Sequence, residues 1–171
     1  ETGFERHDFK YKGVKSLLVI PDSPAKGYPW VWRARFFGHQ PQADIELLKR
    51  GFHLAYCDVA GLFGNQVAVE RWNEFYQMLI TQRGLSKKPA LEGMSRGGLI
   101  IYNWASVNPE KVSCIYGDAP VCDIRSWPGG KGKGKGGGSA WKAALKAHRI
   151  TDEESKTAKA VSYTHLRAHE T

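Results

Sequence analysis

Short apolar runs alternate with helical segments along this 171-residue sequence, and that order constrains the fold more than any other feature. The runs expected to form strands are 15–20, 30–37, 52–57, 89–92 and 112–116. Helices are expected between them at 41–50, 65–83 and 99–107, and after them at 141–148 and 152–160. Strands that alternate with helices usually pair in parallel, through right-handed crossovers, with helices on both faces of the sheet. The sequence therefore predicts an α/β fold with a mostly parallel central sheet.

A serine stands between two glycines in the stretch LEGMSRGG, where an expected strand meets an expected helix. In one interpretation Ser95 is a helix N-cap, whose hydroxyl accepts a hydrogen bond from a backbone N–H of the first turn. In the other it is a nucleophile elbow, a G-x-S-x-G turn that lifts the hydroxyl above the end of the strand. The elbow requires small neighbours, here Gly93 and Gly97, because the serine backbone is strained and its surroundings are crowded. The strand–turn–helix order favours the elbow.

An elbow predicts an oxyanion hole made of two backbone N–H groups. The first would belong to Arg96, which follows the serine directly. The second is expected from the end of the earlier segment 30–37, where Ala34, Arg35 and Phe36 are candidates and Arg35 is preferred. An equal alternative for Arg35 is that of a surface arginine paired with an acid.

A serine hydrolase also needs an acid and a histidine base, in the chain order serine, acid, histidine. Asp118 follows the next expected strand and is the candidate acid, although a turn residue that satisfies the backbone of 117–120 is slightly favoured. Asp58 is expected to organise a loop, and His148 is expected to be exposed on a polar helix. The sequence shows no recognisable late strand, acid loop or histidine loop.

The formal net charge is +8, from 25 lysines and arginines against 17 aspartates and glutamates, but most of these cations are scattered. The sequence has no basic helix face and no aromatic-and-basic strand pattern of the kind that indicates nucleic-acid binding. It has no apolar stretch near the roughly 20 residues that a membrane-spanning helix needs. The expected partner is therefore a small-molecule substrate of the ester type, with no nucleic acid and no membrane, and the oligomeric state is open.

Glycines and lysines alternate in segment 128–139, which holds the one dense group of cations, Lys131, Lys133 and Lys135. The segment lacks the GxxxxGK[ST] order of a phosphate-binding loop. We interpret it as a flexible, solvated loop. The alternative hypothesis is that it lies near Ser95 and attracts an anionic substrate.

Three cysteines, Cys57, Cys114 and Cys122, leave the cellular compartment undetermined. Their number is odd and no CxxC pair occurs, so the sequence predicts neither a disulfide framework nor a zinc site. Cys57 and Cys114 lie in or beside apolar runs and are expected to be buried. No cluster of ligand residues points to a metal or another cofactor. The chain begins at Glu1 without a signal-peptide pattern, so a cytoplasmic location and secretion after loss of a signal peptide both stay open.

Four longer blocks carry a resemblance to a known family: WVWRARFFGHQPQAD, FHLAYCDVAGLFG, KKPALEGMSRGGLIIYNWA and IYGDAPVCDIRSWPGGKGKGKG. In this order they resemble a bacterial group of α/β-hydrolase-fold proteins, described as α/β hydrolases or esterases, over residues 1–160. The resemblance implies that Ser95 is the nucleophile and that Arg96 lies at the oxyanion hole. It also implies two further strands, an acid in a Gly-Asp-x-Asp loop and a histidine near the C-terminus, which this sequence does not show.

Residues 1–160 are accordingly predicted to be the N-terminal part of a single α/β-hydrolase domain, truncated before its acid and histidine. The ending 161–171 resembles a translated tail found on unrelated metagenomic reading frames, so His165 and His169 are not assigned as the base. The predicted activity of the intact protein is hydrolysis of carboxylic esters through Ser95, without a metal or cofactor. A non-catalytic ligand-binding protein of the same fold and a peptidase are the alternatives.

Overall fold

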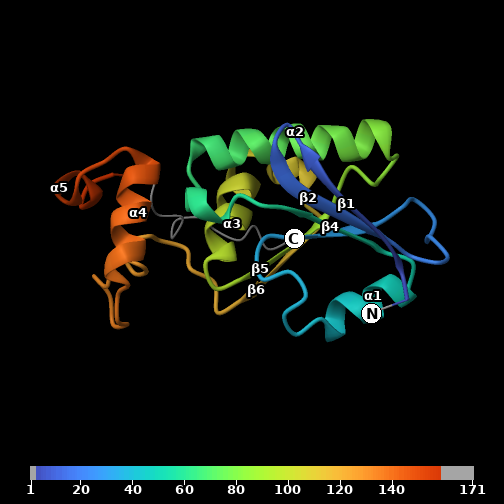
Figure 1. Ribbon diagram of the computed structural model, residues 1–171, viewed down its shortest axis with the longest axis horizontal. Helices are drawn as coiled ribbons and strands as arrows, with labels where there is room; N and C mark the ends of the chain where they lie inside the picture. Colours follow the sequence, from blue (N-terminus) through green and yellow to red (C-terminus); the bar gives the residue numbers. More distant parts are fainter. Residues whose placement is uncertain (1–2, 159–171) are drawn as a thin grey trace.

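The computed structural model describes residues 3–158, which form a six-stranded sheet with helices on both faces (Figure 1). The predicted tail 161–171, with His165 and His169, lies outside the described residues. The strands are β1 (Glu5–Tyr11), β2 (Val14–Ile20), β3 (Trp30–Arg33), β4 (His53–Cys57), β5 (Ala90–Met94) and β6 (Cys114–Asp118).

The spatial order of the strands is β1-β2-β4-β3-β5-β6. β3 pairs in parallel with β4 and β5, and β5 pairs in parallel with β6. β2 is antiparallel to both β1 and β4. The sheet is therefore mixed and mostly parallel, which confirms the predicted α/β fold.

β1 is a strand that the hydrophobic pattern of the sequence does not indicate. It forms a hairpin with β2, in which Tyr11 pairs with Val14 across a two-residue turn. Lys12 (φ +47°) and Gly13 (φ +80°) both adopt left-handed backbone angles, as a type I′ hairpin turn requires. Because β1 lies at the edge of the sheet, it has exposed and half-buried side chains instead of the apolar run of an inner strand.

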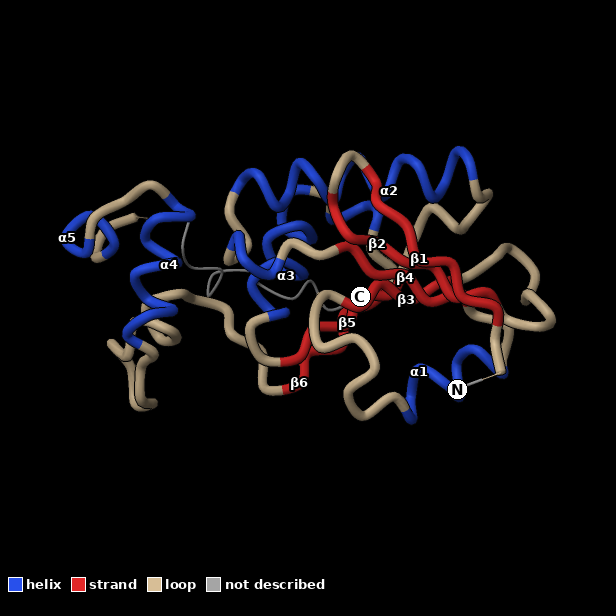
Figure 2. Tube along the Cα trace, viewed as in Figure 1, coloured by secondary structure: helices blue, strands red, loops and turns tan. Residues whose placement is uncertain are grey.

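The helices are α1 (Gln42–Lys49), α2 (Gln66–Gln82), α3 (Gly97–Val107), α4 (Gly138–His148) and α5 (Asp152–Ser155), with short 3₁₀ turns η1 (Ala60–Leu62) and η2 (Pro109–Lys111). The first three cover the two faces of the sheet, and α4 and α5 lie beyond one end of it (Figure 2). α1 lies on one face, where Leu48 packs in one cluster with Val31 and Leu54. α2 and α3 lie on the other face, over the larger apolar cluster.

Two helix ends follow local signals in the sequence. The side chain of Asn65 accepts a hydrogen bond from the Ala68 N–H at 2.9 Å and caps α2. After α1, Gly51 has a left-handed backbone (φ +86°), and a methyl group built on it would lie 2.5 Å from the backbone nitrogen of Ala25. Glycine is therefore needed at this position, both to end the helix and to let the loop before β3 approach it.

Tryptophans fill the core between the sheet and helices α2 and α3. Trp32 of β3, Trp72 of α2 and Trp104 of α3 are each fully buried. The rings of Trp32 and Trp72 stack with their centroids 3.8 Å apart, and Trp104 meets Trp32 edge-on at 5.2 Å. Such large, rigid side chains hold β3 against both helices. β3 in turn leads directly into the candidate site.

Two elements are shorter than the sequence pattern suggests. The segment 30–37 is a strand only as far as Arg33, because the left-handed backbone of Phe36 (φ +52°) turns the chain out of the extended conformation. The helix expected at 152–160 begins as predicted but ends at Ser155. The first of these differences matters for function, since it makes the end of the segment a loop beside β5.

β6 lies at the edge of the sheet opposite β1, and this placement corrects the prediction for Cys114. Cys114 is exposed rather than buried, as are Ile115 and Tyr116 beside it. The reason is that, among residues 3–158, no strand pairs with the outer side of β6. Cys57, on the inner strand β4, is buried as expected.

Candidate active site

Ser95 forms the sharp turn between β5 and α3 and has a left-handed backbone (φ +50°). Its N–H donates to the Asp118 carbonyl at 2.9 Å, and its own carbonyl accepts from the N–H groups of Gly98 at 3.0 Å and Val121 at 2.8 Å. These hydrogen bonds hold a conformation that costs a non-glycine residue about 1–3 kcal/mol. The N-cap of α3 is Arg96, and no side chain caps the helix. The interpretation of Ser95 as a simple N-cap is therefore wrong.

The glycines around this serine occupy positions where a larger residue would not fit. A methyl group built on Gly93 would lie 2.5 Å from Cδ1 of Ile101 and 3.0 Å from the carbonyl carbon of Gly97. On Gly98 it would lie 2.6 Å from the carbonyl oxygen of Val121. Gly93 and Gly98 thus permit the close approach of α3 and of the loop after β6 that keeps the turn sharp.

The loop after β3 reaches the same turn. A methyl group built on Gly97 would lie 3.3 Å from Cβ of Ala34 and 3.6 Å from the backbone nitrogen of Arg35. The N–H of Ala34 donates to the Glu92 carbonyl at 2.9 Å, so it is committed to the sheet. Within the described part of the chain, the N–H groups of Arg35 and Arg96 have no hydrogen-bond acceptor. Two open backbone donors therefore lie at the serine turn.

The side chains of Arg35 and Arg96 contact aromatic rings rather than acids. The guanidinium of Arg96 lies over the rings of Phe63 and Trp127, 4.9 and 5.4 Å from their centroids. That of Arg35 lies 4.7 Å from the centroid of Phe36, its neighbour in the loop. Among residues that the structure describes, neither Nε atom has an acceptor, and both are buried. The alternative interpretation of Arg35 as an arginine paired with an acid is therefore wrong for this part of the chain.

A buried ionic cluster, which the sequence pattern does not indicate, holds the loop after β3. Arg33 is 2% exposed, and its Nη1 donates to Oδ2 of Asp44 and lies 3.3 Å from Oε1 of Glu92. The same guanidinium donates to the carbonyl oxygens of Arg35 at 3.3 Å and His39 at 2.5 Å. One arginine therefore connects acids on α1 and β5 to two carbonyls of the loop.

Two carboxyl groups share the single arginine of this cluster, and this sharing changes their protonation. Burial, the negative charge of Asp44 and a hydrogen bond with it raise the pKa of Glu92 to about 7, while Arg33 acts in the opposite direction. Asp118 on β6 adds to the rise in the pKa of Glu92. Oδ1 of Asp44 is buried without a donor among the described residues, so a proton on Glu92 would supply one. The cluster therefore retains a proton on Glu92 to near neutral pH.

The two aspartates singled out in the sequence both lie at the carboxyl ends of strands. Asp118 is opposite Met94 in the register of β5 and β6, and its backbone carbonyl accepts the N–H of Ser95. A catalytic role for its side chain stays a prediction. The carboxylate of Asp58, after β4, accepts the N–H of Ala60 at 3.2 Å, as expected for a residue that organises a loop.

His148 is not the exposed residue that its polar helix suggests. Its side chain is half-buried against the loop after η1, and Nε2 donates to the Phe63 carbonyl at 3.0 Å. Burial lowers the pKa of His148, against the effect of that hydrogen bond. Among residues 3–158, none of the histidines forms a hydrogen bond with Ser95. The described residues thus bring two open backbone N–H groups to the serine turn, but no histidine that hydrogen-bonds with the serine.

The glycine–lysine segment 128–139 is partly engaged with the helices that follow it. Nζ of Lys131 lies 3.0 Å from Oδ1 of Asp152 and 5.0 Å from the ring centroid of Trp141. Lys133 and Lys135 are exposed. One of the three lysines is therefore committed to an internal ion pair, and a position of the segment near the serine stays a prediction.

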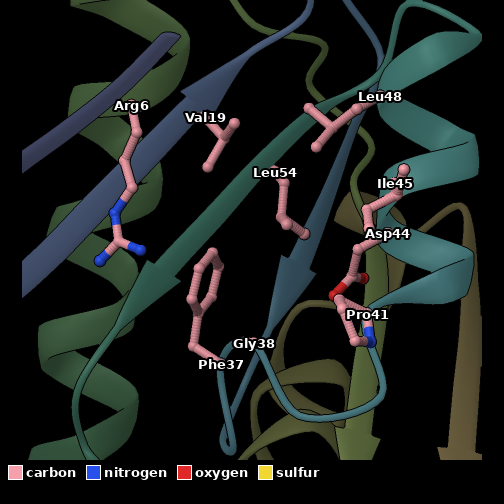
Figure 3. A pocket seen from close by; sticks show the side chains of 9 residues that line it. All are labelled: Arg6, Val19, Phe37, Gly38, Pro41, Asp44, Ile45, Leu48 and Leu54. Atoms are coloured by element: carbon pink, nitrogen blue, oxygen red, sulfur yellow. The ribbon is translucent and has the colours of Figure 1, made fainter. Parts of the chain in front are cut away.

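A cavity of about 180 Å³ lies on the α1 face of the sheet (Figure 3). Arg6 and Phe37 line one side, and Asp44 and Ile45 of α1 line the other. Its remaining wall is mostly apolar, and no residue of the serine turn lines it. Through Asp44 it adjoins the ionic cluster, and no residue of β5 lines it. It is thus separate from the candidate active site.

No arrangement in the described residues suggests a metal centre or a membrane span. No group of three or more histidine, cysteine, aspartate or glutamate side chains within 3–158 is placed to hold a metal ion. In the same range, none of the helices combines the length and apolar character that crossing a bilayer requires.

Comparison with known proteins places this fold among hydrolase structures. No protein-family model and no curated protein matches the sequence. A candidate dipeptidyl aminopeptidase IV from Bacteroides ovatus matches with a TM-score of 0.65 and 15% identity, over 94% of this chain and 26% of that one. An acetyl xylan esterase from Aspergillus awamori matches with a TM-score of 0.52 and 15% identity, over 67% and 53% of the two chains. A cold-adapted esterase from an Arctic intertidal metagenomic library gives 0.50 and 13%, over 67% and 59%.

These similarities show the fold, because the identities are too low to carry function. This chain spans a little over half the length of the two esterases and about a quarter of the Bacteroides protein. Within that span, the mixed sheet, the flanking helices and the strand–serine–helix turn lie in one continuous arrangement. The chain has the α/β-hydrolase fold, over the part of it that these residues cover.

Proposed function

We propose that the protein is a serine hydrolase that cleaves carboxylic esters, with Ser95 as the nucleophile. The observation that carries this proposal is the strained turn, in which a serine with φ of +50° is held by three backbone hydrogen bonds. A left-handed serine lowers the stability of the protein, and residues strained in this way cluster at active sites and ligand-binding sites. The fold shared with esterase structures is compatible with this class of reaction, although a fold alone does not establish it.

In the proposed reaction, Oγ of Ser95 attacks the ester carbonyl carbon while a general base takes its proton. The carbonyl oxygen becomes an oxyanion, and the backbone N–H groups of Arg96 and Arg35 donate hydrogen bonds to it. Because Arg96 begins α3, the positive end of the helix dipole favours the same negative charge. The alcohol leaves with the proton from the base, and water then hydrolyses the acyl-serine by the same route.

We assign the histidine base to a part of the protein outside residues 3–158, and keep Asp118 as the candidate acid within them. This assignment is supported by the other contacts of the described histidines, such as that of His148 with Phe63. It predicts that an external base can replace the histidine. Imidazole in solution should therefore accelerate reactions of Ser95 in this chain.

Fluorophosphonate labelling tests the nucleophile, because the probe forms a covalent bond with an activated serine. We expect labelling of the wild-type chain that rises with imidazole concentration and is lost in Ser95→Ala. The matched control is Ser139→Ala, which removes an exposed serine of α4 and should leave labelling unchanged. Labelling that persists in Ser95→Ala would contradict the proposal, as would its absence at every imidazole concentration; the second result favours a non-catalytic ligand-binding protein.

A peptidase is the second candidate, and the match to a candidate dipeptidyl aminopeptidase over 94% of this chain favours it. The two activities differ in the leaving group that the acylated serine releases. Turnover of p-nitrophenyl acetate with no turnover of an aminoacyl p-nitroanilide, in the presence of imidazole, would support the esterase. The reverse preference would support the peptidase.

A further inference from the structure

The side chains of Arg35 and Arg96 form a feature of the serine turn that is distinct from their backbone N–H groups. Each guanidinium is held against aromatic rings, and each Nε is buried without an acceptor in the described residues. A buried donor left unpaired destabilises the folded protein, because it has lost its hydrogen bonds to water without replacing them. Such groups are uncommon in folded proteins, and each one calls for a specific explanation, such as a role in catalysis or in binding an ion.

The two positive charges are close enough to influence each other. Burial lowers the pKa of Arg96, and the charge of Arg35 lowers it further, whereas Asp58 acts in the opposite direction. Arg33, only two residues before Arg35, differs because Asp44 compensates its charge. Within residues 3–158, neither Arg35 nor Arg96 has an acid within ion-pair distance. In the described part of the chain, the turn therefore carries two guanidinium groups that form no ion pair.

A hollow of about 360 Å³ adjoins the first arginine of this pair, Arg35. Arg35 lines it together with Arg6, Lys15 and Tyr56. Arg6 is paired with Asp8 at 2.6 Å, whereas Lys15 forms no ion pair in the described part of the chain. The hollow is thus lined mainly by cationic groups on its polar side. Because Arg35 belongs both to it and to the serine turn, a bound molecule could extend from one to the other.

We propose that the side chains of Arg35 and Arg96 bind an oxyanionic group, a carboxylate or a phosphate, of the ester that Ser95 attacks. This inference rests on the proposed function and names its substrate class. The planar guanidinium group offers several N–H donors in a geometry that matches both anions. A neutral ester would leave both arginines unpaired. The arginine pair thereby takes the role considered for the glycine–lysine segment, in which Lys131 is already paired with Asp152.

Equilibrium binding tests this inference without any turnover. Wild-type protein is titrated calorimetrically at low ionic strength with inorganic phosphate and, separately, with succinate. We expect binding of at least one of them, and an increase in Kd of about tenfold or more in Arg35→Gln and in Arg96→Gln, since each removes charged donors. The matched control is the double variant Lys133→Gln/Lys135→Gln, which removes two exposed charges and should bind as the wild type does.

Charge-conserving variants keep the test interpretable if a glutamine variant does not fold. Arg35→Lys and Arg96→Lys retain the charge but not the planar donor set, and should raise Kd by about threefold or more. Binding of phosphate alone identifies a phosphate group, and binding of succinate alone identifies a carboxylate. The proposal is overturned if the wild type binds neither anion or if the arginine variants bind with unchanged Kd. It is also overturned if Kd rises as much in the lysine control as in the arginine variants. Intact anion binding without labelling of Ser95 would contradict the hydrolase but not this site.

Discussion

Glu92→Gln is the perturbation that tests the buried ionic cluster most directly. Glutamine keeps the shape of the side chain, offers an N–H donor to Asp44 and cannot ionise. In the folded protein, burial and Asp44 raise the pKa of Glu92 to about 7, Asp118 adds to the rise and Arg33 opposes it, whereas the ordinary value is 4.5. Between these pH values the folded state binds more protons than the unfolded state. The free energy of unfolding of the wild type should therefore fall as the pH rises through this window.

The magnitude follows from the width of that window. Each pH unit over which only the folded state holds the proton changes the free energy of unfolding by about 1.4 kcal/mol. Between 4.5 and about 7 the total is roughly 3 kcal/mol for Glu92, against about 5–15 kcal/mol for a typical domain. Glu92→Gln lacks this contribution. The difference in stability should therefore shift in favour of the variant by up to about 3 kcal/mol between pH 4.5 and pH 8.

Urea unfolding followed by tryptophan fluorescence measures this difference, in buffers from pH 4.5 to pH 8. The matched control is Glu46→Gln, on the exposed side of α1, where the glutamate pairs with Arg50 at 3.1 Å and with no other cation of residues 3–158. The difference in free energy of unfolding between Glu46→Gln and the wild type should stay constant from pH 4.5 to pH 8. If the profile of Glu92→Gln also runs parallel to that of the wild type, the folded protein does not hold the proton on Glu92, and the reasoning is refuted.

Two further substitutions test the backbone strain and the charge balance. Ser95→Gly removes the left-handed serine and should raise the free energy of unfolding by about 1 kcal/mol, whereas Ser95→Ala should not raise it. Thermal unfolding compares the two variants, and equal stability would show that the serine is not strained. Arg33→Met leaves buried carboxylates without a cation and should lower the free energy of unfolding by about 3–5 kcal/mol in urea. The control Arg50→Met, at an exposed arginine, should change the free energy of unfolding by less than about 0.5 kcal/mol. A similar loss of stability in the two arginine variants would argue against a stabilising role of the ionic cluster.

The parts of the site that could be predicted from the sequence are those whose signals are contiguous along the chain. An apolar run, a glycine-flanked serine and a second apolar run follow one another in 89–107, and the structure forms β5, the turn and α3 from them. β1 could not be predicted from the hydrophobic pattern, because an edge strand needs no apolar run. The predicted burial of Cys114 is wrong for a related reason, since β6 has the composition of an inner strand but lies at an edge of the sheet.

The ionic cluster could not be predicted, because its members come together only through the register of the sheet. Arg33 pairs with Glu92 across β3 and β5, while Asp44 arrives from α1. An arginine at the end of an apolar run usually marks the point where a strand leaves the core; here two acids allow it to stay buried. Its hydrogen bonds engage the carbonyl of Arg35 and leave the N–H of that residue open.

The serine turn and the loop after β3 are therefore each held by a separate set of hydrogen bonds. Backbone hydrogen bonds hold Ser95, and a buried side chain holds the loop that faces Gly97. Donors stabilise a developing oxyanion well only if they do not have to reorganise when the charge appears. A loop held by its carbonyl oxygens meets this condition, because the hydrogen bonds from Arg33 engage those oxygens and leave the N–H of Arg35 free to donate. On this reasoning, loosening Arg33 would disturb the proposed oxyanion hole even though its side chain contacts neither the serine nor the substrate.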